Sequence, residues 1–173
     1  MSNPSDKPAR ESEFWRFSLN FYGLPDVAPA CLVLQDEAGV DVNLLLYLLF
    51  LASMRREAGA EHVAKLDATV ALWRDETVKP LRVLRRALKA GIGDIPPATS
   101  DNFRNMVKRV ELEAERLEQL KLEETGAALE LTMAGTREGA ARANLAAYGH
   151  FLKRTFPAAA LATVQSAFEA SAR

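Results

Sequence analysis

The sequence contains little cysteine and isoleucine, and each shortage carries information. Cys31 is the single cysteine, which excludes an internal disulfide and a cysteine zinc cluster. It lies in the apolar run ACLVL, which favours a small buried hydrophobe over a reactive thiol. Isoleucine occurs only at Ile92 and Ile95, whereas leucine and alanine dominate the apolar residues. Because leucine and alanine suit helices and β-branched residues suit strands, the composition favours helices.

The chain also lacks a strong net charge and a long hydrophobic segment. Its 22 Lys and Arg residues nearly balance 23 Asp and Glu residues, for a formal net charge of −1. No global field attracts nucleic acid, so a nucleic-acid partner is not expected. The longest uncharged apolar run, Val42 to Met54, is shorter than the roughly 20 residues of a membrane span. Because no signal-peptide pattern is seen either, we expect no membrane association and a cytoplasmic location.

The length of 173 residues suits one domain, because such a chain can bury a core without disulfides or metals. We expect residues 1–11, which are polar and mixed in charge, to form a disordered N-terminal tail. Residues 12–173 are expected to form a single helical domain. The glycine- and proline-rich segment 91–97 is interpreted as a loop, because each side is too short for an independent core.

Apolar residues recur at spacings of three and four along most of the chain, which predicts an all-α fold. The segment that begins at Val42 is apolar on every side, and such a helix belongs at the centre of a bundle. We therefore predict a single-domain bundle of about six to eight helices around a central helix over 42–57, with no strand. The predicted helices span residues 13–22, 27–37, 42–57, 61–77, 80–89, 101–124, 136–155 and 157 onward. The predicted N-caps include Ser12, Asp26, Asp41, Thr136 and either Thr99 or Ser100.

Several segments are similar to those of a known family. They are FWRFSLNFYGLPDVAPACLVLQDEAGVDVNLLLYLLFLA from Phe14, then Trp73, PLRVLRRALK from Pro80 and ELEAER from Glu111. Together, over roughly Phe14 to Tyr148, they resemble an uncharacterised family of small proteobacterial proteins, a domain of unknown function. The resemblance implies a bacterial, intracellular protein with an all-helical fold. It implies no catalytic or binding residue.

A polar cluster surrounds the turn before the predicted central helix. Asp36, Asp41 and Asn43 have oxygen atoms that could bind Mg²⁺ or Ca²⁺, but their spacing does not match an EF-hand loop. A structural interpretation is preferred, in which Asp41 caps the helix and Asn43 satisfies backbone donors in its first turn. We therefore expect no metal site and no cofactor.

A basic stripe follows the predicted helix over 80–89. Its residues are Lys79, Arg82, Arg85, Arg86 and Lys89. Such a stripe could bind a phosphate group, an acidic partner or, less in keeping with the net charge, nucleic acid. The longest predicted helix carries Glu111, Glu115 and Glu118, so the two sets of charges could instead pair with each other.

The sequence contains no HExxH motif, phosphate-binding loop or GxSxG elbow, so an enzyme that uses a metal or a nucleophilic side chain has no positive support. We predict a non-catalytic interaction or regulatory module that contacts another protein through the 79–89 stripe. The alternative is an enzyme or small-ligand binder with a pocket between the first three helices and Asp36, Asp41 and Asn43 near its mouth. A deep cavity with converging polar side chains favours the alternative, and a filled core with an exposed patch favours the module. The sequence leaves a homodimer open.

Overall fold

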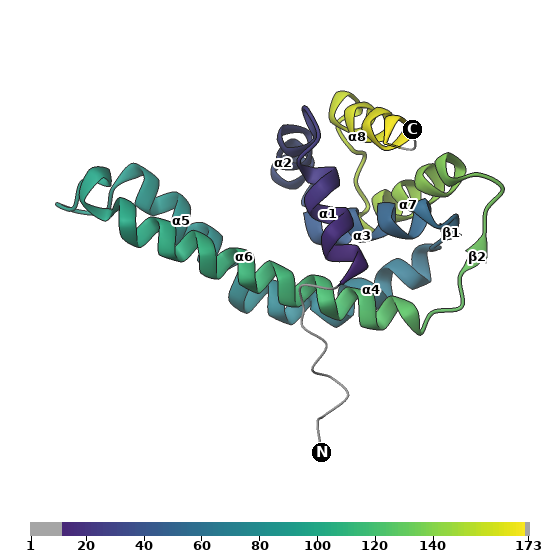
Figure 1. The fold of residues 1–173 in the computed structure, drawn as a ribbon, viewed down its shortest axis with the longest axis horizontal. Helices are drawn as coiled ribbons and strands as arrows, with labels where there is room; N and C mark the ends of the chain where they lie inside the picture. Colours follow the sequence, from purple (N-terminus) through teal and green to yellow (C-terminus); the bar gives the residue numbers. More distant parts are fainter. Residues whose placement is uncertain (1–11, 172–173) are drawn as a thin grey trace, which may run out of the picture.

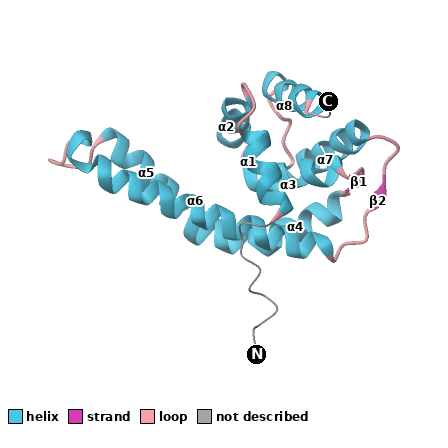
Figure 2. Ribbon diagram, viewed as in Figure 1, coloured by secondary structure: helices cyan, strands magenta, loops and turns pink. Residues whose placement is uncertain are grey.

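Residues 12–171, which this computed structural model describes, form an all-α fold as predicted (Figure 1). The predicted tail over 1–11 lies outside these residues. A π-helical turn, η2, separates α4 from α5, and two very short antiparallel strands interrupt an otherwise helical chain (Figure 2). The elements are α1 (Glu13–Tyr22), α2 (Val27–Ala38), α3 (Val42–Ser53), β1 (Arg56–Glu57), α4 (Ala60–Trp73), η2 (Arg74–Val78), α5 (Lys79–Ala90), α6 (Pro97–Ala127), β2 (Thr132–Met133), α7 (Arg137–Leu152) and α8 (Ala158–Ala170).

Helix α3 is the centre of the fold, as predicted. Every side chain from Asn43 to Leu49 is buried, and α3 contacts α1, α2, α6 and α7. A helix that is apolar on all sides stabilises the fold most when neighbouring helices bury each of its sides. Asp41 caps α3 as predicted, because its Oδ1 atom accepts hydrogen bonds from the backbone N–H groups of Asn43 at 2.8 Å and Leu44 at 3.4 Å.

The central helix is shorter than predicted, because it ends at Ser53 rather than at residue 57. Arg55 has a left-handed φ of 58°, which turns the chain out of the helix. The following residues form β1, which pairs with β2, so the prediction of no strand was wrong. The buried Asn144 of α7 holds this turn, because its side-chain nitrogen donates to a β1 carbonyl at 3.0 Å.

Two predictions of helix starts were also wrong. Asp26 precedes α2, but its left-handed backbone (φ 63°) leaves its side chain without a capping hydrogen bond in the described chain. The longest helix begins at Pro97 rather than after Thr99 or Ser100, since proline fits the first helical turn. Ser100 therefore lies within the helix, where its hydroxyl donates to the Pro97 carbonyl at 3.3 Å.

Helices α5 and α6 form a hairpin that projects from the other helices (Figure 1). We call this hairpin the arm and the remaining helices the body. The main contacts of α5 within the described residues are with α6 and η2. The 31 residues of α6 make it about 46 Å long, so only its C-terminal part lies against α1, α3 and α4. The N-terminal part of α6 therefore belongs to the arm and lies outside the body.

None of the described helices is both long and apolar enough to cross a membrane by itself. Helices α1 and α2 pass that test only when they are taken together, and the chain bends by 98° between them. The apolar helix α3 has 12 residues and is buried inside the fold.

Gly126 lies where α6 passes the buried ring of Tyr47 in α3. A Cβ atom at Gly126 would lie 1.8 Å from the Tyr47 hydroxyl oxygen and 2.6 Å from its Cζ atom. Because the packed core holds this ring in place, we expect Gly126→Ala to lower the free energy of unfolding by about 2 kcal/mol. Urea unfolding followed by circular dichroism measures the change. Gly135→Ala is the control, since a Cβ atom there meets nothing within 4 Å. Equal stability of both variants would contradict the close approach.

Candidate functional site

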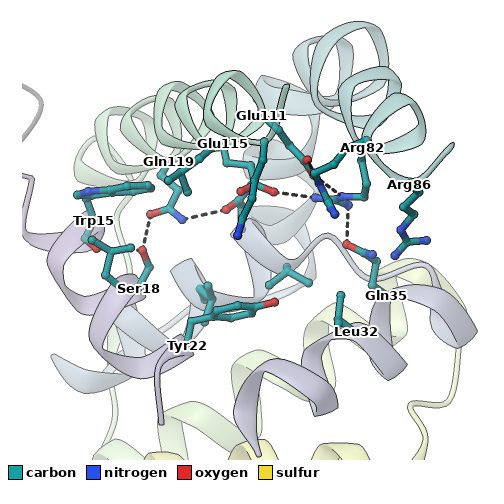
Figure 3. A pocket seen from close by; sticks show the side chains of 17 residues that line it. Trp15, Ser18, Tyr22, Leu32, Gln35, Arg82, Arg86, Glu111, Glu115 and Gln119 are labelled. Carbon is teal, nitrogen blue, oxygen red and sulfur yellow. Dashed lines mark hydrogen bonds and ion pairs between the residues drawn. The ribbon is translucent and has the colours of Figure 1, made fainter. Parts of the chain in front are cut away.

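The first candidate site is a pocket between the body and the arm, which we call the corner pocket (Figure 3). Its volume is about 300 Å³, and α1, α2 and α3 line one side while α5 and α6 line the other. Apolar and aromatic side chains form much of its wall, among them Trp15, Tyr22, Leu32 and Leu112. It is therefore a concave site with a largely apolar surface.

Arginines and glutamates of the arm form the charged wall of the corner pocket. Arg82 contacts Glu115 at 2.8 Å and Glu111 at 3.3 Å, and Arg85 also pairs with Glu111. Only 6% of the Glu111 side chain is exposed, so these two arginines must neutralise a buried charge. Arg82 also donates to the side-chain oxygen of Gln35 in α2. The same guanidinium thus connects the arm to the body.

The remaining residues of the predicted basic stripe are more exposed. Arg86 lines the corner pocket, and its side chain lies 3.5 Å from Asp36, with about half of each side chain exposed. Lys79 contacts Asp75 at 2.7 Å on the surface, and Lys89 is exposed. Such surface pairs contribute little free energy. The five basic residues therefore do not form one uniform face.

Lys108 of α6 also lines the corner pocket, and sequence reasoning missed it. It forms no ion pair within residues 12–171. Its only sequence signal is its place on the flank of the helix, one residue after the buried Val107. The charged residues that line the pocket are Arg82, Arg85, Arg86, Lys108, Glu111 and Glu115. Four cations and two carboxylates give the pocket a formal charge of +2.

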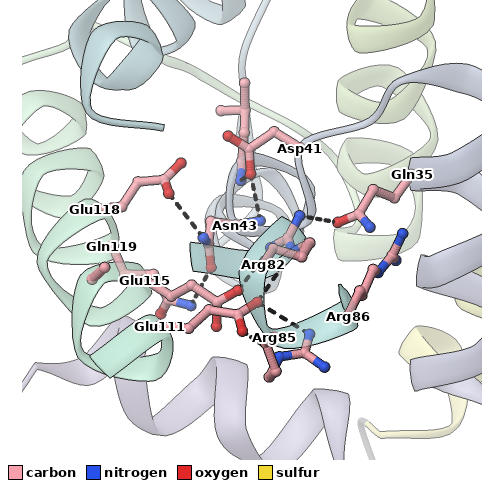
Figure 4. A network of polar contacts seen from close by, with 12 residues as sticks. Gln35, Asp41, Asn43, Arg82, Arg85, Arg86, Glu111, Glu115, Glu118 and Gln119 are labelled. Carbon is pink, nitrogen blue, oxygen red and sulfur yellow. Dashed lines mark hydrogen bonds and ion pairs between the residues drawn. The ribbon is translucent and has the colours of Figure 1, made fainter. Parts of the chain in front are cut away.

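Buried hydrogen bonds connect α1, α6 and α3 along one side of the corner pocket (Figure 3, Figure 4). Ser18 donates to Gln119 at 2.8 Å, and Gln119 donates to Asn43 at 2.9 Å. Asn43 in turn donates to Glu118 at 3.1 Å. The side chain of Asn43 therefore contacts α6, rather than the backbone donors that the sequence predicted. Because all of these groups are buried, the hydrogen bonds fix the position of α6 along α3.

The second candidate site is a polar cavity of about 440 Å³ that shares Arg82 with the corner pocket. Arg74 of η2 bridges two carboxylates at its wall, Asp41 at 3.0 Å and Asp67 at 2.7 Å. The Tyr148 hydroxyl accepts a hydrogen bond from the backbone N–H of Asp41 at 2.8 Å. Asp41 is thus committed to capping α3 and to pairing with Arg74.

The predicted polar cluster separates into two environments. Asp41 and Asn43 line the polar cavity, whereas Asp36 is exposed on α2 beside Arg86. Asn43 also lines the corner pocket, so it lies between the two sites. Across the part of the chain that the structure describes, no group of three or more His, Cys, Asp or Glu residues could hold a metal ion.

Glu118 is buried at the edge of the polar cavity. One of its carboxyl oxygens accepts from Asn43, and the other, Oε1, has no partner in the described chain. Burial and the nearby charge of Asp41 raise the pKa of Glu118 well above its ordinary value. The raised pKa favours the protonated, uncharged form of Glu118 at this buried position.

Glu118→Gln tests this protonation, because the amide keeps a donor and an acceptor but does not titrate. The raised pKa of folded Glu118 adds stability at low pH, and this contribution falls as the pH rises above the unfolded pKa of about 4.3. As the pH rises above about 5, we expect wild type to lose stability relative to Glu118→Gln, at most by the slope of one proton, on the order of 1 kcal/mol per pH unit. Urea unfolding at each pH measures the difference, with the exposed Glu124→Gln as control. Parallel pH profiles for wild type and Glu118→Gln would contradict a raised pKa.

Replacing both Arg82 and Arg85 with Gln tests whether the charged wall also stabilises the fold. The double variant leaves Glu111 buried without a cation, so we expect the free energy of unfolding to fall by about 3 kcal/mol. Arg86→Gln removes only a surface contact and should change stability by less than about 0.5 kcal/mol. Urea unfolding compares the variants, and adding Glu111→Gln to the double variant should restore part of the loss. If the double variant were as stable as wild type, Glu111 would not need the two arginines as partners.

The fold and the two cavities define an all-α protein whose helical arm forms one wall of a charged pocket. A family model described as a protein of unknown function (DUF2390) matches residues 13–122, more than half of the chain. The chain therefore belongs to this family of unknown function, and the match spans α1 to most of α6. No curated protein and no solved structure matches the chain.

Proposed function

We propose that this protein binds a small amphipathic organic anion in the corner pocket. The observation that supports this most strongly is the meeting of an apolar wall and a net positive wall in one concave site. Small-molecule sites are clefts of roughly 300–1,000 Å³ that combine apolar surface with a few convergent polar groups. The corner pocket lies at the lower end of this range, which suits a compact ligand.

The two walls suit different parts of the ligand. Trp15, Tyr22 and Leu32 offer apolar contact to an aromatic or aliphatic body. Arg82 and Arg85 already bind glutamates. The cations left for an anionic group are Lys108 and Arg86, whose only ion pair among the described residues is the exposed 3.5 Å contact with Asp36. A carboxylate, sulfonate or phosphate group can accept charge-assisted hydrogen bonds from both.

The geometry supports ligand binding better than a protein-interaction module that acts through the 79–89 stripe. Three residues of the stripe, Arg82, Arg85 and Arg86, line the corner pocket, and two of them are committed to ion pairs. A single exposed basic face would have favoured the module. The proposal assigns binding and no reaction, in keeping with the lack of a catalytic motif in the sequence.

We also propose that the protein works in the cytoplasm of a bacterium, as its sequence indicates. The single cysteine supports a reducing compartment, because the chain needs no disulfide. Cys31 is fully buried, and burial raises the pKa of its thiol to about 12, so it is inert rather than reactive.

Two fluorescent probes that share one aromatic body test the proposed function. 1-Anilinonaphthalene-8-sulfonate carries a sulfonate, and N-phenyl-1-naphthylamine has nearly the same rings without a charge. We expect wild type to bind one equivalent of the sulfonate, about tenfold more tightly than the uncharged probe. Fluorescence titration gives the affinities, and isothermal titration calorimetry gives the stoichiometry.

A double variant with Arg86→Gln and Lys108→Gln identifies the anion contacts. It should lower the affinity for the sulfonate probe about tenfold and leave the uncharged probe unchanged. Arg109→Gln is the matched control, because Arg109 is exposed on the same helix but does not line the pocket. The proposal fails if wild type binds both probes equally well, or if Arg109→Gln weakens sulfonate binding as much as the double variant.

A further inference from the structure

The side of the arm that faces away from the corner pocket is apolar and exposed. We call it the outer face. It consists of Trp73, Leu84, Phe103, Met106, Val110 and Leu117. Each of these side chains keeps between 37% and 55% of its surface exposed.

Helical geometry places the α6 residues of the outer face opposite the corner pocket. Phe103, Val110 and Leu117 follow one another at intervals of seven residues, so they lie on the same side of α6. Lys108 and Leu112, which line the pocket, each lie two positions from Val110, or about 200° around the helix.

The outer face continues from α6 onto α5 and α4. Leu84 lies two positions from both Arg82 and Arg86, so it points away from the pocket that they line. The Nε1–H group of Trp73 donates to the Ala114 carbonyl of α6 at 2.9 Å, which holds the indole ring against that helix. The outer face therefore extends across both helices of the arm and includes Trp73 at the end of α4.

The arm has too little buried surface to be stable as an isolated two-helix layer. Within residues 79–113, Leu88 and Val107 are the buried apolar side chains. With about 200 Å² for a large apolar side chain, the outer face exposes on the order of 600 Å². Monomers rarely expose a contiguous apolar patch of more than a few hundred Å², whereas a standard interface buries about 800 Å² per partner.

We propose that the outer face packs against the outer face of a second copy of this chain. The arm presents two antiparallel helices with one apolar side uncovered, which is half of a four-helix bundle. A twofold axis brings identical surfaces together, and the apolar area approaches what a stable dimer needs. The corner pockets lie on the opposite side of each arm and stay open in this dimer.

Sedimentation velocity and light scattering of the full chain, at concentrations up to about 100 µM, test the proposal. We expect a mass twice the 19.0 kDa of one chain. The double variant Met106→Glu with Val110→Glu should be monomeric with an unchanged helical circular dichroism spectrum. Met133→Glu is the matched control, because Met133 is equally exposed on β2, and it should remain dimeric.

An introduced cysteine gives a second measurement that does not place charge in the interface. Val110→Cys provides an accessible thiol, because Val110 is exposed. The native Cys31 does not compete for the oxidant, since it is fully buried. Val110 lies midway between Phe103 and Leu117, so the two copies of it face each other when the arms pair. Oxidation with diamide should yield a disulfide-linked dimer from Val110→Cys and none from Met133→Cys.

Three results would overturn the proposal. They are a monomeric wild type at about 100 µM, dimers that persist in the glutamate variant, and no disulfide-linked dimer from Val110→Cys. A monomer would mean that the outer face is not a contact between two copies of this chain.

Discussion

The complete burial of α3 is the constraint on which the rest of the structure depends. Because α3 has no polar side, helices must cover it all round, and α6 covers the side that contains Asn43. A buried amide needs hydrogen-bond partners, and Glu118 and Gln119 supply them. This match sets the position of α6, and its N-terminal part therefore extends beyond the body as one helix of the arm.

The charged groups around this contact place the arm. A π-turn forms at η2, where the N–H of Lys79 donates to the Arg74 carbonyl five residues earlier and the next residue is a proline. Arg74 at the start of this turn contacts Asp41. In the first turn of α5, which follows η2, Arg82 contacts both α6 and α2. The charged wall of the corner pocket is thus built from ion pairs within the arm, and the hydrogen bond from Arg82 to Gln35 joins this wall to the body.

Local features were predictable from the sequence, and features that depend on distant contacts were not. The Asp41 cap and the burial of α3 follow from neighbouring residues, so both could be predicted. The turn at β1 depends on Asn144, which lies nearly 90 residues later and has no local signal. The basic stripe could be found in the sequence because its residues recur along one helix. Its division could not, because the packing of α5 on α6 decides that Arg82 contacts Glu115 while Lys79 is exposed to solvent. An amphipathic pattern also cannot tell a helix that covers a body from one that projects beyond it.

The two sides of the arm differ in chemistry, and this difference would let one hairpin take part in both proposed contacts. Charged residues on the pocket side are held by directional ion pairs, whereas the outer face offers only non-directional apolar area. Because Lys108 and Val110 lie about 200° apart on α6, a ligand in the pocket and a second copy on the outer face do not compete for the same side chains.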